Sequence, residues 1–220
     1  MIPPQHNSEF VARMERVLDV YKRPYDSRFP VVCMDESPRQ LIEDISDAIP
    51  AAPGRPRRQD YEYKRLGTCN VFMASEPLAG RRRVEVTARK TKVDWALFVQ
   101  GIAQDYAQAE KITLVMDNFA THTASAFYET FAPEEAKRLW DRFDFVFTPK
   151  HGSWLNMAEI ELNVLIGQCL NRRIAHIETV RDEVRAWQAQ RDSLKATINW
   201  QFTNAKARIK LKRLYPTLDT

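Results

Sequence analysis

Apolar positions recur along the chain at two spacings, and each spacing predicts a different kind of element. Apolar residues that return every three or four positions predict amphipathic helices. Shorter runs that end at proline or polar residues predict strands. The helical pattern covers residues 8–22, 92–108, 153–173 and 179–194, with two shorter helices near 124–131 and 133–143. Ser8 and Ser153 are the expected N-caps of the first and the longest helix.

The predicted strands are of two types. Residues 31–35 form a short, continuously apolar run that ends in an acid, which is typical of a strand buried on both faces. Residues 111–118 predict a second buried strand that ends in an acid, and residues 143–149 predict a strand that Pro149 stops. Two further segments, 61–75 and 81–89, flank a short turn and predict an antiparallel hairpin. We expect residues 36–45 to form a turn or a short helix, and the proline-rich residues 50–60 to form an exposed loop. This order of elements predicts an α/β fold with a mixed central sheet and helices on both faces.

Composition narrows the class of protein. The chain has 220 residues, of which 44% are hydrophobic and 28% charged, as in a soluble globular domain. No apolar run approaches the roughly 20 residues that span a bilayer, and residues 1–10 lack the features of a signal peptide. We therefore expect a cytoplasmic protein without a membrane partner. Three widely separated cysteines argue against a disulfide framework.

Basic residues are concentrated at the C-terminal end of the chain. The net charge is only +4, but residues 193–218 contain no acid. Within this segment Lys206, Lys210 and Arg213 are candidates for contacts with a DNA backbone, against the alternative of ordinary solvated charges. We divide the chain into an N-terminal helix and linker (1–30), a catalytic domain (31–195) and a basic C-terminal tail (196–220).

Two aspartates occupy the same kind of position. Asp35 follows the apolar run VVCM, and Asp117 follows ITLVM. If the two strands are neighbours, both carboxylates lie at strand ends about 4.8 Å apart and can share a divalent cation. Glu159, near the start of the long helix, is the third candidate. The alternative for each aspartate is a turn or a helix cap.

Two other acids compete with these three. Glu36 adjoins Asp35, but side chains alternate along a strand, so only one of the two is expected to enter the site, and we choose Asp35. Glu161 lies about 200° around the helix from Glu159, so we expect it on another face, in solvent. Asn156, which precedes Glu159 by three residues, extends a polar stripe toward the proposed site.

Three segments carry a resemblance to a known family. They read VVCMDES, LVMDNFATH and FTPKHGSWLNMAEIEL, and they resemble, in order, the acidic motifs of the DDE transposases of the insertion-sequence 630 family, in the Tc/mariner superfamily. The C-terminal segment INWQFTNAKARIKLKRLYP is also similar to that family. The resemblance implies an RNase H-like fold and a metal-dependent DNA endonuclease that also joins strands, with hydrolysis at the element's end followed by attack of the freed 3′-hydroxyl on target DNA.

By this resemblance Asp35, Asp117 and Glu159 are the catalytic, metal-binding triad, and the metal is Mg²⁺ or Mn²⁺, with two ions. Other residues fall on motif positions without a defined role, or are candidates for contact with DNA: Asn118, His122, Lys150, His151, Ser153, Trp154 and Asn156. His122 either orients a phosphate or an acid or is a structural histidine. Trp154 either stacks on a base or packs in the core.

The resemblance also sets expectations about partners. They are DNA, as element ends and target, and further copies of the chain. Family members usually carry an N-terminal helix-turn-helix region, and the chain starts near where that region should end. We therefore expect a catalytic part that works with a separate helix-turn-helix subunit or the product of an upstream reading frame. The alternatives are a truncated, inactive remnant that only binds DNA or a partner, and a host RNase H-like nuclease.

Overall fold

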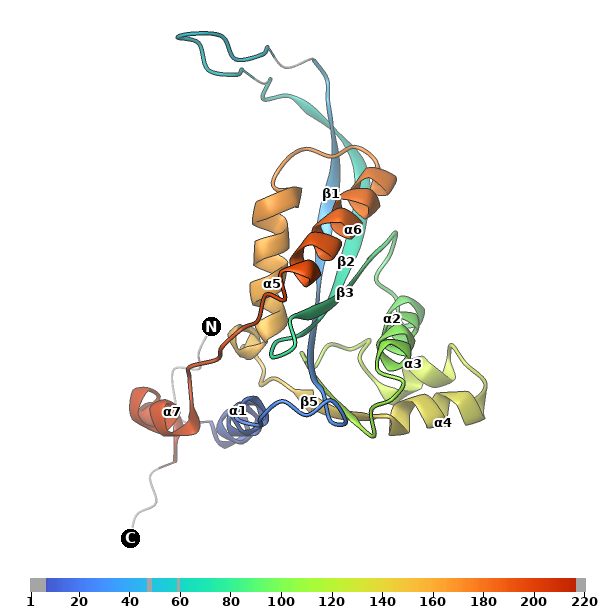
Figure 1. Cartoon of the computed structure of the whole chain (residues 1–220), viewed down its shortest axis with the longest axis vertical. Coiled ribbons are helices and arrows are strands. Elements are labelled where there is room, and N and C mark those ends of the chain that lie inside the picture. Colours follow the sequence, from blue (N-terminus) through green and yellow to red (C-terminus); the bar gives the residue numbers. More distant parts are fainter. Residues whose placement is uncertain (1–6, 47–48, 59, 217–220) are drawn as a thin grey trace.

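The centre of the computed structural model, which describes residues 7–46, 49–58 and 60–216, is a five-stranded sheet of order β3-β2-β1-β4-β5 (Figure 1). The strands are β1 (Val31–Asp44), β2 (Tyr63–Glu76), β3 (Arg81–Thr87), β4 (Ile112–Met116) and β5 (Phe143–Phe147). β1, β2 and β3 pair antiparallel, whereas β4 pairs parallel to both β1 and β5. The predicted mixed sheet and the predicted hairpin of β2 and β3 are confirmed.

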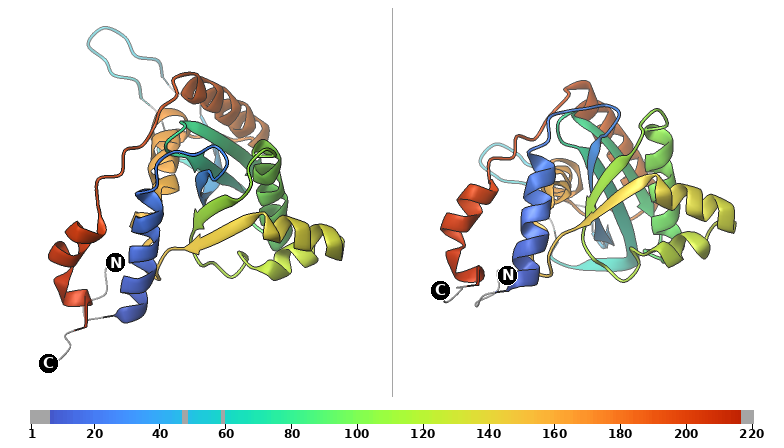
Figure 2. Two further views of the ribbon diagram at one scale, coloured as in Figure 1. Left: turned by 60° about the horizontal axis from the view of Figure 1, so that its bottom comes forward. Right: turned by 90° about the horizontal axis from the view of Figure 1, so that it is seen from below.

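Helices cover both faces of this sheet, and each face has its own buried core. One face packs against α2 (Lys92–Asp105), α3 (Ala124–Tyr128) and α4 (Pro133–Asp141). The other face packs against α1 (Ser8–Tyr21), α5 (Met157–Leu165) and α6 (Ile177–Ser193). The helix α7 (Asn204–Lys210) lies beside α1 (Figure 2), where Arg208 pairs with Glu15 at 2.9 Å. Part of the predicted basic tail is therefore a packed helix.

The apolar start of β1 is buried on both sides of the sheet. Val32 and Met34 belong to the core beneath α2, whereas Cys33 belongs to the core beneath α1. This alternation continues into the two acids that follow, so Asp35 faces the α1 and α5 side and Glu36 faces the α2 side. The sheet thus separates two adjacent carboxylates.

The prediction that β1 ends at Asp35 is wrong. The strand continues to Asp44, paired with β2 along its whole later length. Its pairing with β4 stops at Cys33, so the later part of β1 has no strand on that side. A strand with one free side tolerates proline, which lacks a backbone N–H, and this explains how Pro38 lies within β1. Proline in the sequence suggested a turn that the structure does not have.

The predicted helix at 153–173 is divided into three parts. A short 3₁₀ turn (Ser153–Leu155) precedes α5, and a π-helical turn (Ile166–Leu170) follows it. Asn156, and not Ser153, caps α5, because its Oδ1 accepts a hydrogen bond from the N–H of Ala158 at 3.1 Å. The first helix differs from its prediction as well, since Asn7 and not Ser8 is its N-cap. In both cases an asparagine close to the expected serine supplies the capping oxygen.

The connection between β1 and β2 forms an arm that projects from the body of the molecule (Figure 1). Residues 49–58 are exposed, as predicted for the proline-rich loop, whose residue 59 lies outside the described part of the chain. No helix in the described ranges is long and apolar enough to cross a membrane.

Candidate active site

Asp35 and Asp117 lie just beyond the paired part of two neighbouring parallel strands, β1 and β4. β1 and β4 pair with Val31 opposite Thr113 and Cys33 opposite Val115. Asp35 and Asp117 each follow this last pair by two residues, Asp35 within β1 and Asp117 directly after the end of β4 at Met116. The negative charge of Asp117 contributes to the raised pKa of Asp35, so the two carboxylates lie near each other. The strands predicted to be neighbours are neighbours.

Glu159 reaches the same region because the start of α5 is tied to β1. The side chain of Asn156 donates a hydrogen bond from Nδ2 to the carbonyl of Met34 at 2.7 Å, and the same nitrogen lies 3.4 Å from Oδ2 of Asp35. Glu159 stands in the first turn of α5, three residues later. Asn156 is therefore a buried residue that connects α5 to β1, and its burial argues against direct contact with DNA.

The charges around Asp35 show how close these acids are. Burial, together with the negative charges of Glu36, Asp117 and Glu159, raises the pKa of Asp35 to about 7, although the N–H of Glu36 donates to its Oδ1 at 2.8 Å. All three other carboxylates thus act on Asp35 through space.

The donor atoms at this place are carboxylate oxygens. Among the described residues, no three side chains of the His, Cys, Asp and Glu types converge closely enough to hold a metal as they stand. The chemistry of the donors nevertheless fits a hard cation, since Mg²⁺ and Mn²⁺ prefer carboxylate oxygens. A cation would also offset the repulsion between carboxylates, which adds to the effect of burial in raising the pKa of Asp35.

Glu36 takes part in a second, buried arrangement of charges on the opposite face of β1. Its side chain is only 3% exposed, and its Oε1 pairs with Nζ of Lys90 at 2.8 Å. Its Oε2 lies 3.4 Å from Nε2 of His122, and Nδ1 of the same ring lies 2.8 Å from Oδ1 of Asp117. Neither Glu36 nor Lys90 was among the residues predicted for the site. The alternation of side chains along β1 could have predicted that Glu36 faces the opposite side of the sheet from Asp35. No sequence pattern pointed to Lys90.

These contacts shift the pKa values of His122 and Glu36. Burial opposes a charge on His122, but Asp117 and Glu36 outweigh it and raise the pKa of the imidazole to about 9. Burial likewise opposes the charge on Glu36, yet His122 and Lys90 hold the pKa of that carboxyl below its ordinary value. His122 therefore faces an acid, which is one of the two roles expected for it.

A cavity of about 540 Å³ opens beside Asp117. Asn118 and Phe119 line one part of it, and Lys150 and His151 line another. The start of α1 completes the wall through Asn7, Glu9, Phe10 and Arg13, and the remaining lining residues are Thr148, Pro149 and Ser153. The structure thus brings three predicted contact residues, Asn118, Lys150 and His151, to one space next to a candidate catalytic acid.

The other candidates lie elsewhere. Trp154 is partly buried in the core beneath α1, and its ring meets that of Phe202 edge to face at 5.7 Å, which is a packing role. Lys206, Lys210 and Arg213 are exposed on α7 and the turn after it, with Nζ of Lys206 donating to the carbonyl of Gln201 at 2.7 Å.

The expectation that Glu161 lies in solvent is wrong. Its side chain is 0% exposed and pairs with Arg82 at 2.6 Å and with Arg191 at 2.9 Å. Burial opposes its charge, but the two guanidinium groups hold its pKa below the ordinary value. The separation of its helix face from that of Glu159 was predicted correctly, and basic partners on β3 and α6 made the other face an ion-pair site.

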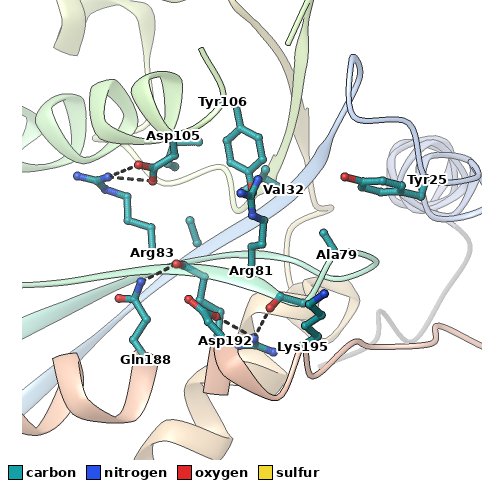
Figure 3. Close-up of a pocket in the computed structure, with 14 residues that line it drawn as sticks. Tyr25, Val32, Ala79, Arg81, Arg83, Asp105, Tyr106, Gln188, Asp192 and Lys195 are labelled. Carbon is teal, nitrogen blue, oxygen red and sulfur yellow. Dashed lines mark hydrogen bonds and ion pairs between the residues drawn. The ribbon is translucent and has the colours of Figure 1, made fainter. Parts of the chain in front are cut away.

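A second cavity, of about 750 Å³, lies at the start of β3 (Figure 3), and its lining does not include Asp35, Asp117 or Glu159. Arg81, Lys195 and Asp192 line it, together with Arg83, whose Nη1 pairs with Asp105 at 2.9 Å. None of the residues predicted for the site lies in this lining. The cavity beside Asp117 is the one that bears on the candidate chemistry.

The segment that carries the three candidate acids matches a known family. A model of the family described as DDE superfamily endonuclease matches residues 30–181, a range that includes Asp35, Asp117 and Glu159. No curated protein sequence matches the chain.

The fold is shared with transposase structures. The chain is similar to the Mos1 strand transfer complex with a TM-score of 0.59 at 15% identity, over 89% of this chain and 59% of that one. For the Mos1 mariner paired end complex with Mn the TM-score is 0.56 at 15% identity, over 89% of this chain and 60% of that one. For the mariner Mos1 paired end complex with Mg it is 0.57 at 14% identity, over 99% and 66%. The chain thus spans about three fifths of the Mos1 chain in the first two, and the RNase H-like fold is confirmed.

Proposed function

The chain belongs to the DDE superfamily endonucleases, and from this premise we propose that it is the catalytic domain of a transposase of the insertion-sequence 630 family. The proposed reactions are metal-dependent cleavage of DNA at the element's end and transfer of the freed strand to target DNA. Both are in-line displacements at phosphorus. The order of the three acidic motifs along the sequence supports this family within the Tc/mariner superfamily.

One observation carries the proposal. Asp35 and Asp117 follow the paired parts of two neighbouring parallel strands, and Asp117 and Glu159 are near enough for their charges to act on Asp35. Burying like charges in one place costs stability, and a protein retains such an arrangement where a cation offsets it.

Asp35, Asp117 and Glu159 would hold Mg²⁺ or Mn²⁺, with two ions. Two bound ions of this kind activate the attacking oxygen and stabilise the leaving oxygen of a phosphodiester. The chain's own contribution is to place the acids. Asn156 holds Glu159 beside Asp35, while Lys150 and Asn118 line the adjoining cavity, where they would contact the phosphates of the bound strand.

The proposed partner is DNA, as element end and as target. Mos1 is described in paired end and strand transfer complexes, and this supports DNA as the ligand of a similar fold. We also propose that the chain acts as a homo-oligomer in the bacterial cytosol, with a helix-turn-helix subunit or upstream product that recognises the element's ends. Neither an inactive remnant nor a host RNase H-like nuclease is favoured by any observation on this chain.

The direct test is nicking of a supercoiled plasmid that carries the DNA flanking the gene, with Mg²⁺ or Mn²⁺. The wild-type chain should nick it, and Asp35→Asn, Asp117→Asn and Glu159→Gln should each abolish nicking without loss of fold. Two exposed acids of α4 provide matched controls, Glu134→Gln and Asp141→Asn, which should retain wild-type rates.

Circular dichroism would confirm that each variant is folded. Activity that survives in Glu159→Gln but is abolished in Glu161→Gln would overturn the assignment on α5. Nicking by all three triad variants at the wild-type rate would overturn the proposed function.

A further inference from the structure

A continuous line of ionisable side chains runs from the surface to Asp117 on the α2 side of the sheet. It begins at Lys90 and passes through Glu36 and His122, with successive separations of 2.8, 3.4 and 2.8 Å between paired atoms. Of its four members, only Asp117 belongs to the proposed triad. Two of the others, Glu36 and His122, have side chains no more than 3% exposed.

The ring of His122 has little freedom to turn. It stacks on Trp95, which is fully buried, with ring centroids 5.2 Å apart and an interplanar angle of 27°. The ring of Phe119 lies 5.9 Å from the His122 ring between centroids, and Nζ of Lys90 lies 4.1 Å from the centre of the Phe119 ring. The backbone carbonyl of Asp117 adds a contact, 3.2 Å from Nδ1. The imidazole thus lies between two carboxylates, and its packing against Trp95 and its contact with the Asp117 carbonyl restrict its orientation.

The position of Asp117 explains why such support is needed. β4 ends at Met116, so Asp117 is the first residue of the loop that follows, and its side chain is 38% exposed. Asp35, in contrast, lies within a continuous strand. A carboxylate at the start of a loop has rotamers and backbone freedom that a strand residue lacks. The contact with His122 removes that freedom on one side.

We propose that His122 and Glu36 are positioning residues that fix the carboxylate of Asp117 for metal binding, with Lys90 anchoring Glu36 at the outer end. The inference rests on the proposed function, because it takes Asp117 as a metal-holding group. Partners of metal-binding side chains orient the ligand, and their removal typically lowers metal affinity or activity about 10- to 100-fold.

The test is the affinity of the folded, DNA-free chain for Mn²⁺, measured by electron paramagnetic resonance. Glu36→Gln and His122→Gln should lower the affinity about 10- to 100-fold. His122→Asn should retain more of it than His122→Gln, because an asparagine amide can take the place of Nδ1 opposite Asp117. Glu76→Gln is the matched control, since Glu76 is also a buried acid of the sheet but hydrogen-bonds Tyr106 instead, and its Mn²⁺ affinity should be that of the wild type.

A second measurement needs no variant. Addition of Mg²⁺ to the wild-type chain should shift the ring ¹⁵N resonances of His122 and leave those of His176, at the start of α6, unchanged. Folded Glu36→Gln and His122→Gln chains that bind Mn²⁺ within twofold of the wild type would overturn the inference, as would a His122 ring indifferent to Mg²⁺. A wild-type chain that binds no Mn²⁺ would instead overturn the proposed function itself.

Discussion

The side-chain amide of Asn156 donates a hydrogen bond to the main-chain carbonyl of Met34 at 2.7 Å, across 122 residues of sequence. The oxygen of the same amide caps α5 through Ala158. One buried side chain therefore joins the helix that carries Glu159 to the strand that carries Asp35. This connection ties the position of Glu159 on α5 to that of Asp35 on β1.

Asn156→Ala should lower the free energy of unfolding by about 1–3 kcal/mol, because it removes a helix cap and leaves a buried carbonyl without its donor. Urea titration followed by circular dichroism would measure this. Ser153→Ala is the matched control. Ser153 is exposed and makes no capping hydrogen bond, so its replacement should change stability by less than about 0.5 kcal/mol. Equal effects of the two substitutions would refute the assignment of the cap.

Asp35→Asn should stabilise the chain when metal is removed by a chelator. The pKa of Asp35 is raised from 3.8 to about 7, so its ionisation costs stability increasingly as pH rises from about 4 to 7, and fully above that. We expect a gain of about 1–3 kcal/mol at pH 8, below the limit of about 4 kcal/mol that three pKa units represent.

The melting temperature in a chelator at pH 8 and at pH 5 would check this, with a larger gain at pH 8. Asp144→Asn is the control, because Asp144 is a partly exposed acid paired with Arg16 at 3.1 Å and should give little change. A decrease in stability of Asp35→Asn at pH 8 would contradict the crowding of carboxylates around it.

Glu161→Gln should destabilise the fold strongly at neutral pH and less in acid. It removes the nearer of the two acidic partners of the buried Arg82 and leaves Asp192 at 3.2 Å, which should cost about 3 kcal/mol. The folded-state pKa of Glu161 lies below the ordinary 4.5, so its stabilising effect is present above that pH and disappears as pH falls through the folded-state value.

Unfolding free energies at pH 7.5, 5.5 and 4.0 would therefore converge for wild type and variant toward acid. Glu178→Gln, which removes an exposed acid of α6 paired with Arg181, should change stability by less than about 1 kcal/mol at each pH. A difference between wild type and Glu161→Gln that does not depend on pH would contradict the pairing.

Replacing Lys206, Lys210 and Arg213 together by glutamine should weaken DNA binding and flatten its dependence on salt. Removing one basic side chain from a phosphate lowers the slope of log affinity against log salt concentration by about 0.9. Fluorescence anisotropy at several salt concentrations would measure the slope. Lys111, Lys137 and Arg138, near the α4 end of the sheet, provide a control triple with the same change in charge. An unchanged slope in the variant that lacks Lys206, Lys210 and Arg213 would show that these three residues do not contact DNA.

The sequence predicted the sheet well because a strand that is buried on both faces has a continuous run of apolar residues. The apolar runs before Asp35 and Asp117 predicted two central strands, and they pair as neighbours. Errors arose where a local signal was overridden by the neighbourhood. Pro38 suggested a turn, but the absence of β4 beside it allows proline within the strand. The serine before α5 suggested a cap, yet a nearby asparagine reaches both the helix and β1.

The surroundings of the acids were harder to predict than the acids. The resemblance pointed to Asp35, Asp117 and Glu159, which stay a prediction until metal binding is measured. Glu36 has two partners, Lys90 and His122, and both come from segments far along the chain. Such contacts follow from tertiary packing alone. Glu161 was misplaced for the same reason, since its partners lie on β3 and α6.

Because Asp35 and Glu36 point to opposite sides of the sheet, a one-residue slip of β1 that set Glu36 in the place of Asp35 would also set Asp35 in the fully buried place of Met34. The opposite slip would set Met34 in the place of Asp35. The boundary between the apolar run and the first acid therefore fixes the alignment of this strand, and the Asn156 amide that binds the Met34 carbonyl reinforces it. The same three side chains that close the core, Val32, Cys33 and Met34, thus decide which acid stands beside Glu159.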